Sequence, residues 1–256
     1  MENEATDRGS LSFTLWGIPT VIRPSSWLVL LILGSSGSTQ PELLPTLLFV
    51  AAGMLCLLVH EYGHALTCRA MGGGGSSIEI ASLGGVTRSA YVPRTRTGHL
   101  LMVLAGPGAS LLLAAVGGVA LGLSIGNLSA GVVCAFCAPL SHLLPPGFLP
   151  VWDDSFIIIR EALMSESLNL TVFMCYHTLF FVCVWWSLLN LLPIPPLDGG
   201  QALRLATGNT LLACRVGLTV AVLLAVVCLT KVWIFNGLIC IYLAYRNWQF
   251  LKLLRQ

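Results

Sequence analysis

The chain has 256 residues, of which 56% are hydrophobic and only 9% are charged, and its mean hydropathy is +0.85. This composition excludes an ordinary soluble domain and indicates a polytopic membrane protein. The formal net charge is +2, and no basic stripe with interleaved aromatic residues stands out, so nothing indicates binding to nucleic acid.

Six apolar segments are candidates for membrane-spanning helices, which need roughly 20 residues to cross a hydrocarbon core about 30 Å thick. In chain order they are Trp27 to about Gly37, Leu43 to about Leu66, Leu100 to Leu123, Leu170 to Leu192, about Leu211 to Leu229, and Val232 to Leu251. The first is the weakest, because its strong apolar character ends near Leu33. We expect an all-α membrane protein forming one domain over residues 1–256, with its core at about 27–205 and a C-terminal helix pair at about 210–251.

Two connections between these segments are more than simple loops. Between the second and third spans, Ile78 to Val92 has strand-type residues interrupted by the pair Gly84-Gly85, which predicts a small membrane-associated β element such as a hairpin or bent strand. Between the third and fourth spans, Ser124 to Ser167 contains four prolines that disfavour a regular span. We interpret it as an interfacial or re-entrant lid followed by an acidic, soluble piece.

The basic residues predict the orientation in the membrane. With six spans and a cytoplasmic N-terminus, eleven of the thirteen Lys and Arg residues fall on the inside, and only Arg160 and Lys231 fall outside. This bias agrees with the positive-inside rule. We therefore expect a multi-pass protein of the cell membrane with both termini in the cytoplasm.

The second apolar segment contains the most informative motif, His60-Glu61-Tyr62-Gly63-His64. On a helix, positions four apart share a face, so the two imidazoles can bind one cation. A hydrolytic zinc ion takes three protein ligands and keeps a fourth position for water, which Glu61 would activate as acid and base. Ionisable side chains at membrane depth are costly, which favours a functional interpretation.

The best candidate for the third ligand is Asp198. It is the only aspartate beside an apolar span, and it follows a proline-rich run, Asn190 to Leu197, that cannot continue a helix. In the predicted topology Asp198 and His64 lie at the same side of the membrane. An alternative is that Asp198 caps the following helix, and it could also do both.

The motif at His60 to Ala65 and the run Asn190 to Gly200 resemble the two signature motifs of the site-2 proteases, the intramembrane zinc metalloproteases of peptidase family M50. The resemblance covers about Trp27 to Leu205. Gly106-Pro107 is similar to a further family element, Gly-Pro-x-x-Asn, although Ser110 stands in the last position. The chain differs from familiar members in having neither a PDZ insertion nor a CBS domain.

This resemblance implies one Zn²⁺ per chain, held by His60, His64 and Asp198, with Glu61 as the catalytic acid and base. It also implies that Asn190 helps to hold the substrate or the oxyanion. The expected substrates are single-span, membrane-anchored regulators such as anti-sigma or pro-sigma factors, cleaved in or near their transmembrane segments. A regulatory membrane partner is also possible.

A transmembrane helix has its peptide groups hydrogen-bonded internally, so a scissile bond must be unwound before water can attack it. The β element with Gly84 and Gly85 would offer a strand edge to such an unwound segment. A plain amphipathic connector is the alternative for this element.

Two other functions remain open at this point. A transporter could bind its ion at the same three ligands, but it would not need Glu61, and no internal repeat is visible. An inactive homologue would bind membrane segments without cleaving them, but its usual sign is loss of Glu61 or of a ligand. Cys134 and Cys137 form a lone CxxC pair, and without a second pair or a nearby thioredoxin-like pattern a redox or metal-binding role is not favoured.

Overall fold

Four long apolar helices form the body of the protein in the computed structural model, which describes residues 9–35, 42–82, 84–141, 150–230 and 234–254. They are α2 (Leu43–Ala70), α3 (Arg96–Ser124), α6 (Leu170–Asn190) and α8 (Thr210–Thr230). Each is long and apolar enough to cross a membrane, and each coincides with a span expected from the sequence. The chain therefore has the character of a membrane protein.

The expected count of about six spans is not confirmed. The first expected span overlaps α1 (Pro24–Ser35), whose 12 residues reach only about 18 Å, and residues 36–41 lie outside the described chain. The last overlaps α9 (Ile234–Leu253), which has 20 residues but is less hydrophobic than the four long helices and is not among the candidate spans. Its C-terminal half carries several polar side chains, including Arg246, Asn247 and Lys252.

A four-stranded sheet accompanies the helices, in the order β1 (Leu11–Leu15), β2 (Ile18–Ile22), β3 (Gly74–Ala81) and β4 (Gly84–Tyr91). The antiparallel β3–β4 pair is the hairpin expected within Ile78 to Val92, and β2 runs parallel to β3. The hairpin of β1 and β2 was not expected, so the β element is larger than the one predicted between the second and third spans. The fold is mostly helical with a small sheet.

The N-terminal hairpin has a local explanation. Three apolar residues of β1 alternate with Ser12 and Thr14, the period of a strand. The turn residues Trp16 and Gly17 both have positive φ, 52° and 75°, which suits a two-residue hairpin turn. Leu15 pairs with Ile18 directly across this turn.

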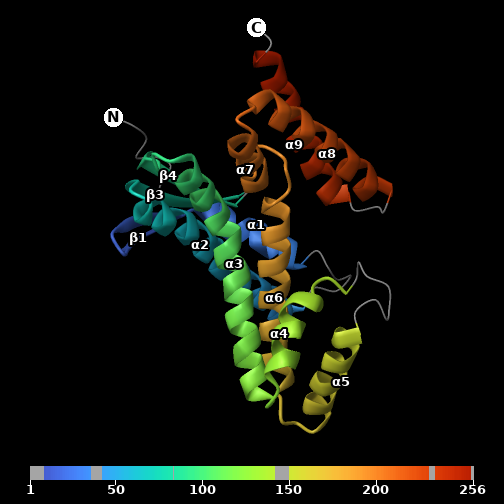
Figure 1. Cartoon of the computed structure of the whole chain (residues 1–256). Helices are drawn as coiled ribbons and strands as arrows, with labels where there is room; N and C mark the ends of the chain where they lie inside the picture. Colours follow the sequence, from blue (N-terminus) through green and yellow to red (C-terminus); the bar gives the residue numbers. More distant parts are fainter. Residues whose placement is uncertain (1–8, 36–41, 83, 142–149, 231–233, 255–256) are drawn as a thin grey trace.

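One face of the sheet packs on α2 at the motif. Ile18, Ile22, Ile78 and Ile80 are each at most 3% exposed and share a core cluster with Tyr62 and Ala65 of α2. The sheet lies beside the upper end of α3 in Figure 1, near the end of α6 from which α7 continues. The strands therefore cover the segment of α2 that carries His60 to His64.

Small residues let the long helices approach closely. A Cβ on Gly63 would lie 2.5 Å from the main-chain oxygen of Ala105, so α2 and α3 touch through backbone at this level. A separate core cluster, which includes Cys56, Leu121 and Phe180, joins α2, α3 and α6. Close backbone approach at small residues is typical of helix packing in membranes.

The segment expected as a proline-rich lid contains two helices, α4 (Leu128–Cys137) and α5 (Pro150–Met164), while residues 142–149 lie outside the described chain. Pro150 begins α5, where a proline is tolerated at the first helical position. The expected acidic piece is therefore mostly helical. Its role as a lid is not tested by this arrangement.

The proline-rich run does break the backbone as expected. Helix α6 ends at Asn190, and α7 (Asp198–Thr207) begins after it. Within the break, Ile194 is fully buried in a cluster with Ala221 of α8 and with Leu243 and Ala244 of α9. The C-terminal helix pair therefore packs directly against the loop that leads to Asp198.

Candidate metal centre

His60 and His64 lie one turn apart on α2 and turn their side chains toward each other. Their Nε2 atoms are 3.2 Å apart, and the two residues are 2% and 9% exposed. The two side chains lie together because they are four residues apart within a continuous helix. The sequence expectation that these imidazoles share a face is confirmed.

Asp198, which is 138 residues after His60 in the chain, completes the cluster. Its Oδ2 atom lies 3.1 Å from Nε2 of His60 and 3.4 Å from Nε2 of His64. Leu197 is the N-cap of α7 and Asp198 is the first residue of the helix, so the alternative that Asp198 is the cap does not hold. Its position in the first turn still places the carboxylate near the positive end of the helix dipole.

The glycines after Asp198 explain how α7 fits there. A Cβ on Gly199 would lie 2.0 Å from the main-chain oxygen of Leu191, and one on Gly200 would lie 2.2 Å from the nitrogen of Pro195. Real Cβ atoms do not approach backbone so closely. The first turn of α7 can therefore fold back against its own preceding loop only because both residues lack a side chain.

The three ligand atoms have the separations that one tetrahedral ion requires. With metal–ligand bonds of about 2.0–2.1 Å, two ligands of a tetrahedral zinc ion lie about 3.4 Å apart. The three observed separations are 3.1, 3.2 and 3.4 Å. Two imidazoles and a carboxylate are also a ligand set found in zinc hydrolases. His60, His64 and Asp198 thus fit a divalent metal ion.

The outer nitrogens of both imidazoles face other partners. Nδ1 of His64 is 2.8 Å from the main-chain oxygen of Met102, to which it can only donate. Nδ1 of His60 is 3.4 Å from the hydroxyl of Ser110. Such partners fix the tautomer and leave Nε2 free for a metal. Ser110 therefore has a contact in the site, although it stands where the family element has Asn.

Gly106 provides the space beside the ligands. A Cβ at this position would lie 2.2 Å from Nε2 of His64 and 2.8 Å from Nε2 of His60. Any side chain at this position would therefore collide with the two nitrogen atoms that are to bind the metal ion. The glycine of the Gly106-Pro107 pair has a steric reason to be there.

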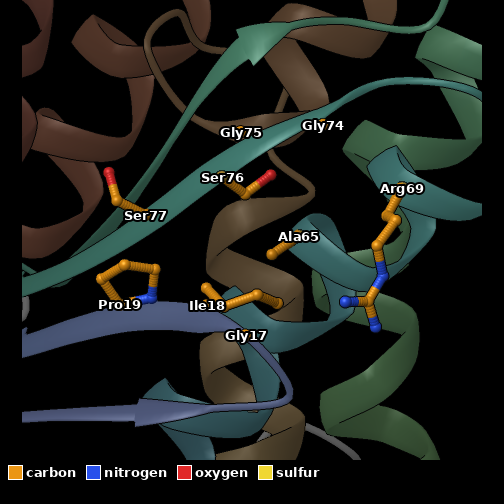
Figure 2. Close-up of a pocket in the computed structure, with 9 residues that line it drawn as sticks. All are labelled: Gly17, Ile18, Pro19, Ala65, Arg69, Gly74, Gly75, Ser76 and Ser77. Carbon is orange, nitrogen blue, oxygen red and sulfur yellow. The ribbon is translucent and has the colours of Figure 1, made fainter.

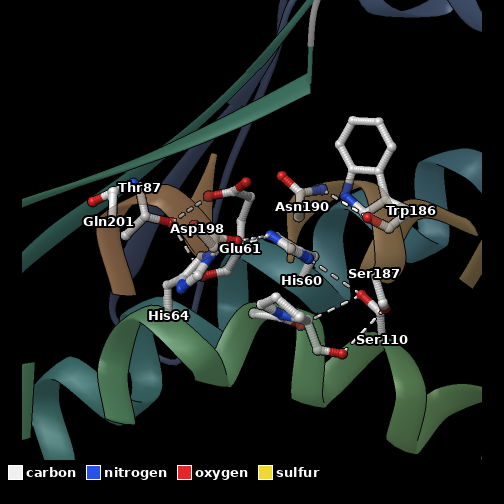
Figure 3. Close-up of polar contacts among 12 residues, drawn as sticks. His60, Glu61, His64, Thr87, Ser110, Trp186, Ser187, Asn190, Asp198 and Gln201 are labelled. Carbon is white, nitrogen blue, oxygen red and sulfur yellow. Dashed lines mark hydrogen bonds and ion pairs between the residues drawn. The ribbon is translucent and has the colours of Figure 1, made fainter. Parts of the chain in front are cut away.

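Glu61 lies beside the three ligands in Figure 3 and is only 4% exposed. Its Oε2 atom accepts a hydrogen bond of 2.7 Å from the hydroxyl of Thr87 on β4. A carboxylate adjacent to a metal site is suited to accepting and returning a proton.

The three residues expected to bind substrate lie close to this centre. A Cβ on Gly85 would come within 2.4 Å of Oε1 of Glu61, and one on Gly84 would come within 3.1 Å of the Trp186 ring. Asn190, at the end of α6, donates through Nδ2 to the main-chain oxygen of Trp186 at 2.9 Å. Their role toward a substrate remains a prediction.

The sequence did not predict the contact of Thr87 with Glu61 described above, nor the role of Arg96. Arg96, at the start of α3, donates to the main-chain oxygens of Leu205 and Ala206 in the last turn of α7. It therefore holds the far end of the helix that begins with Asp198, and its charge suits a helix C-terminus. No local pattern signals a contact between residues more than 100 positions apart.

A separate cavity of about 320 Å³ lies where β2 and β3 diverge above α2 (Figure 2). Its lining includes Ala65, Ser77 and Arg69, whose guanidinium donates to the main-chain oxygen of Trp16 at 2.8 Å. None of the three ligands nor Glu61 lines it. This cavity is therefore distinct from the candidate metal centre.

Comparisons with known proteins agree with this geometry. The structure is similar to that of the site-2 protease from Methanocaldococcus jannaschii, with a TM-score of 0.55 and 19% sequence identity over 94% of each chain, which shows a shared fold. A search of curated proteins finds no significant match. The sequence model of peptidase family M50 matches residues 48–230, a stretch that contains the three candidate ligands and Glu61. The chain belongs to peptidase family M50.

Proposed function

We propose that the protein is an intramembrane zinc endopeptidase that hydrolyses peptide bonds in or near the transmembrane segments of membrane-anchored proteins. The observation that supports this most is the convergence, within 4.8 Å of one another, of two imidazoles from the apolar helix α2 and a carboxylate from the first residue of α7. A bound zinc ion would polarise the scissile carbonyl and lower the pKa of a water molecule from 15.7 to about 7.

The residues of the chain have separate roles in this proposal. His60, His64 and Asp198 hold the ion. Glu61 accepts a proton from the attacking water as its oxygen bonds to the carbonyl carbon, and later returns the proton to the leaving amine as the C–N bond breaks. Because Glu61 is held beside the ligands and is nearly fully buried, bulk water competes little for its carboxylate.

Substrate handling rests on the elements around this centre. Asn190 holds the substrate or the oxyanion, and an unwound segment pairs with the sheet where Gly84 and Gly85 approach Trp186 and Glu61. Strand β4 is at the edge of the sheet in the described part of the chain, so its outer backbone groups can accept such a partner. Helix-breaking residues in a substrate should therefore promote cleavage.

The cellular setting is part of the same proposal. We place the protein in the cytoplasmic membrane as one integral unit over residues 1–256, with both termini and the metal centre toward the cytoplasm. Its substrates are single-span regulators such as anti-sigma or pro-sigma factors, and a membrane partner regulates access. The excess of Lys and Arg in the segments assigned to the cytoplasm supports this orientation.

A cleavage assay tests the proposal. Single-span proteins from the same genome are co-expressed with the wild-type chain or with Glu61→Gln, and the zinc content of both purified chains is measured. Cleavage by the wild type, its loss in Glu61→Gln and unchanged zinc in the variant are expected. Cleavage that persists in Glu61→Gln would remove Glu61 from the mechanism. A wild-type chain that holds zinc but cleaves none of these proteins would contradict the proposal.

A further inference from the structure

Strand β4 lies directly against the side chain of Glu61. A Cβ built on Gly85 would lie 2.3 Å from Cγ and 2.4 Å from Oε1 of Glu61, so the strand backbone occupies the space that a side chain would need. Gly85 and Thr87 are two residues apart on the strand, and therefore face the same side of the sheet. Both face α2.

The hydroxyl of Thr87 makes the specific contact. Its Oγ1 lies 2.7 Å from Oε2 of Glu61 and 3.1 Å from the main-chain oxygen of the same residue. Because the carboxylate is the charged acceptor at the shorter distance, the single hydroxyl proton is best placed on Oε2. Figure 3 shows this bond from the strand to the carboxylate. With Oε2 held, the conformation of the side chain is restricted.

A neighbouring contact shows what is special about Thr87. Thr87 pairs with Ile78, and Ile78 pairs with Thr20, so these residues form one row across three strands. Thr20 lies 2.7 Å, Oγ1 to OH, from Tyr62 on the same turn of α2. Both threonines thus bind α2 from the same face of the sheet, but only Thr87 contacts the proposed acid and base.

We propose that Thr87 is a positioning residue for Glu61, fixing one carboxylate oxygen so that the other is oriented for proton transfer. This inference rests on the proposed function. It also links catalysis to β4, since the strand that holds Glu61 is the strand whose outer edge would pair with the substrate. A proton-transfer group must be held within a narrow range of geometry by its surroundings.

Matched variants test this role. Thr87→Val keeps the branched shape but loses the hydroxyl, and it should lower kcat about 10- to 100-fold with KM and zinc content unchanged. Thr87→Ser keeps the hydroxyl and should remain within about threefold of wild type, whereas Thr87→Ala should resemble Thr87→Val. The control Thr20→Val should lower thermal stability but not kcat. A Thr87→Val chain with wild-type kcat, or a Thr87→Ser chain as impaired as Thr87→Val, would overturn the proposal.

A second measurement does not depend on activity. In the zinc-free protein with ¹³C-labelled glutamate, the infrared carboxylate bands of Glu61 are identified by their loss in Glu61→Gln. They should shift in Thr87→Val and stay in place in Thr87→Ser and Thr20→Val, because only the first loses the hydrogen bond to Oε2. Unshifted bands in Thr87→Val would refute the positioning role even in an active enzyme. A wild-type chain that cleaves nothing would instead refute the proposed function. The infrared measurement would still test the hydrogen bond between Thr87 and Glu61, because it does not depend on cleavage.

Discussion

The side-chain amide of Asn247 donates a hydrogen bond of 2.6 Å to the main-chain oxygen of Pro195. Asn247 is on α9 and only 2% exposed, and Pro195 lies three residues before Asp198. Helix α9 is beyond residues 48–230, the part that matches the family model. The loop that presents the candidate carboxylate ligand is therefore held in part by a helix outside the matched region.

Replacing Asn247 with leucine should weaken zinc binding as well as the fold. The variant keeps the branched shape of the side chain but leaves the Pro195 oxygen without this donor, at a cost of about 1–3 kcal/mol. Part of that cost is offset, because Oδ1 of Asn247 is itself buried without a hydrogen-bond partner among the described residues. Zinc affinity, measured by competition with a chelator, should fall about tenfold, equivalent to about 1.4 kcal/mol.

Asn127→Ala is the control for this prediction. Asn127 caps α4 through a bond to the nitrogen of Ala130, far from the loop, and its loss should cost about 1 kcal/mol of stability. Zinc affinity should not change in this variant. If Asn247→Leu binds zinc as tightly as Asn127→Ala does, the contact with Pro195 does not position Asp198.

Two glycines on α3 offer a matched steric test. Gly106→Ala would place a methyl group 2.2 Å from Nε2 of His64, whereas a Cβ on Gly108 meets nothing within 4 Å. Zinc content of the purified proteins should be lost or strongly reduced in Gly106→Ala and unchanged in Gly108→Ala. The control should also be as stable as wild type or slightly more so, since alanine favours a helix by up to about 1 kcal/mol over glycine. Full zinc occupancy in Gly106→Ala would show that the ion is bound elsewhere.

The sheet carries an acid-sensitive ion pair that is independent of the metal. Arg88 and Arg23 both bind Glu79 and hold the pKa of its carboxyl below the usual value of 4.5, the contact from Arg88 being 2.6 Å. A carboxyl whose pKa is lower in the folded chain stabilises the fold fully above the unfolded value, and this stabilisation disappears as pH falls through the folded value.

Thermal unfolding of wild type and Glu79→Gln in detergent checks this sign. The wild type should be the more stable chain above about pH 4.5, and the difference should shrink steadily as the pH is lowered further. A difference that stays constant or grows toward acid pH would contradict the assigned interaction.

Much of the metal centre could be predicted from the sequence because its signals are local. Four-residue spacing places His60 and His64 on one helix face. The prolines before Asp198 interrupt the helix at the end of the apolar segment that precedes this residue. Four of the six expected spans likewise coincide with helices of spanning length.

What could not be predicted depends on contacts between distant segments. Thr87 and Glu61 are 26 residues apart, and Asn247 and Pro195 are 52 apart, so neither pair leaves a periodic signal. The parallel pairing of β2 with β3 is of the same kind, because it joins strands on either side of two helices. The alternation within β1, by contrast, is a local signal that the sequence carries.

The central claim is that His60, His64 and Asp198 bind one metal ion, and the zinc content of the purified wild-type chain and of Asp198→Ala tests it most directly. The account predicts about one zinc ion per wild-type chain, as expected for a single set of three ligands, and little or none in Asp198→Ala. Glu61→Gln should retain its zinc and so serve as the control for an intact fold. Equal zinc in Asp198→Ala and wild type would contradict the account, because the third ligand would then come from another residue.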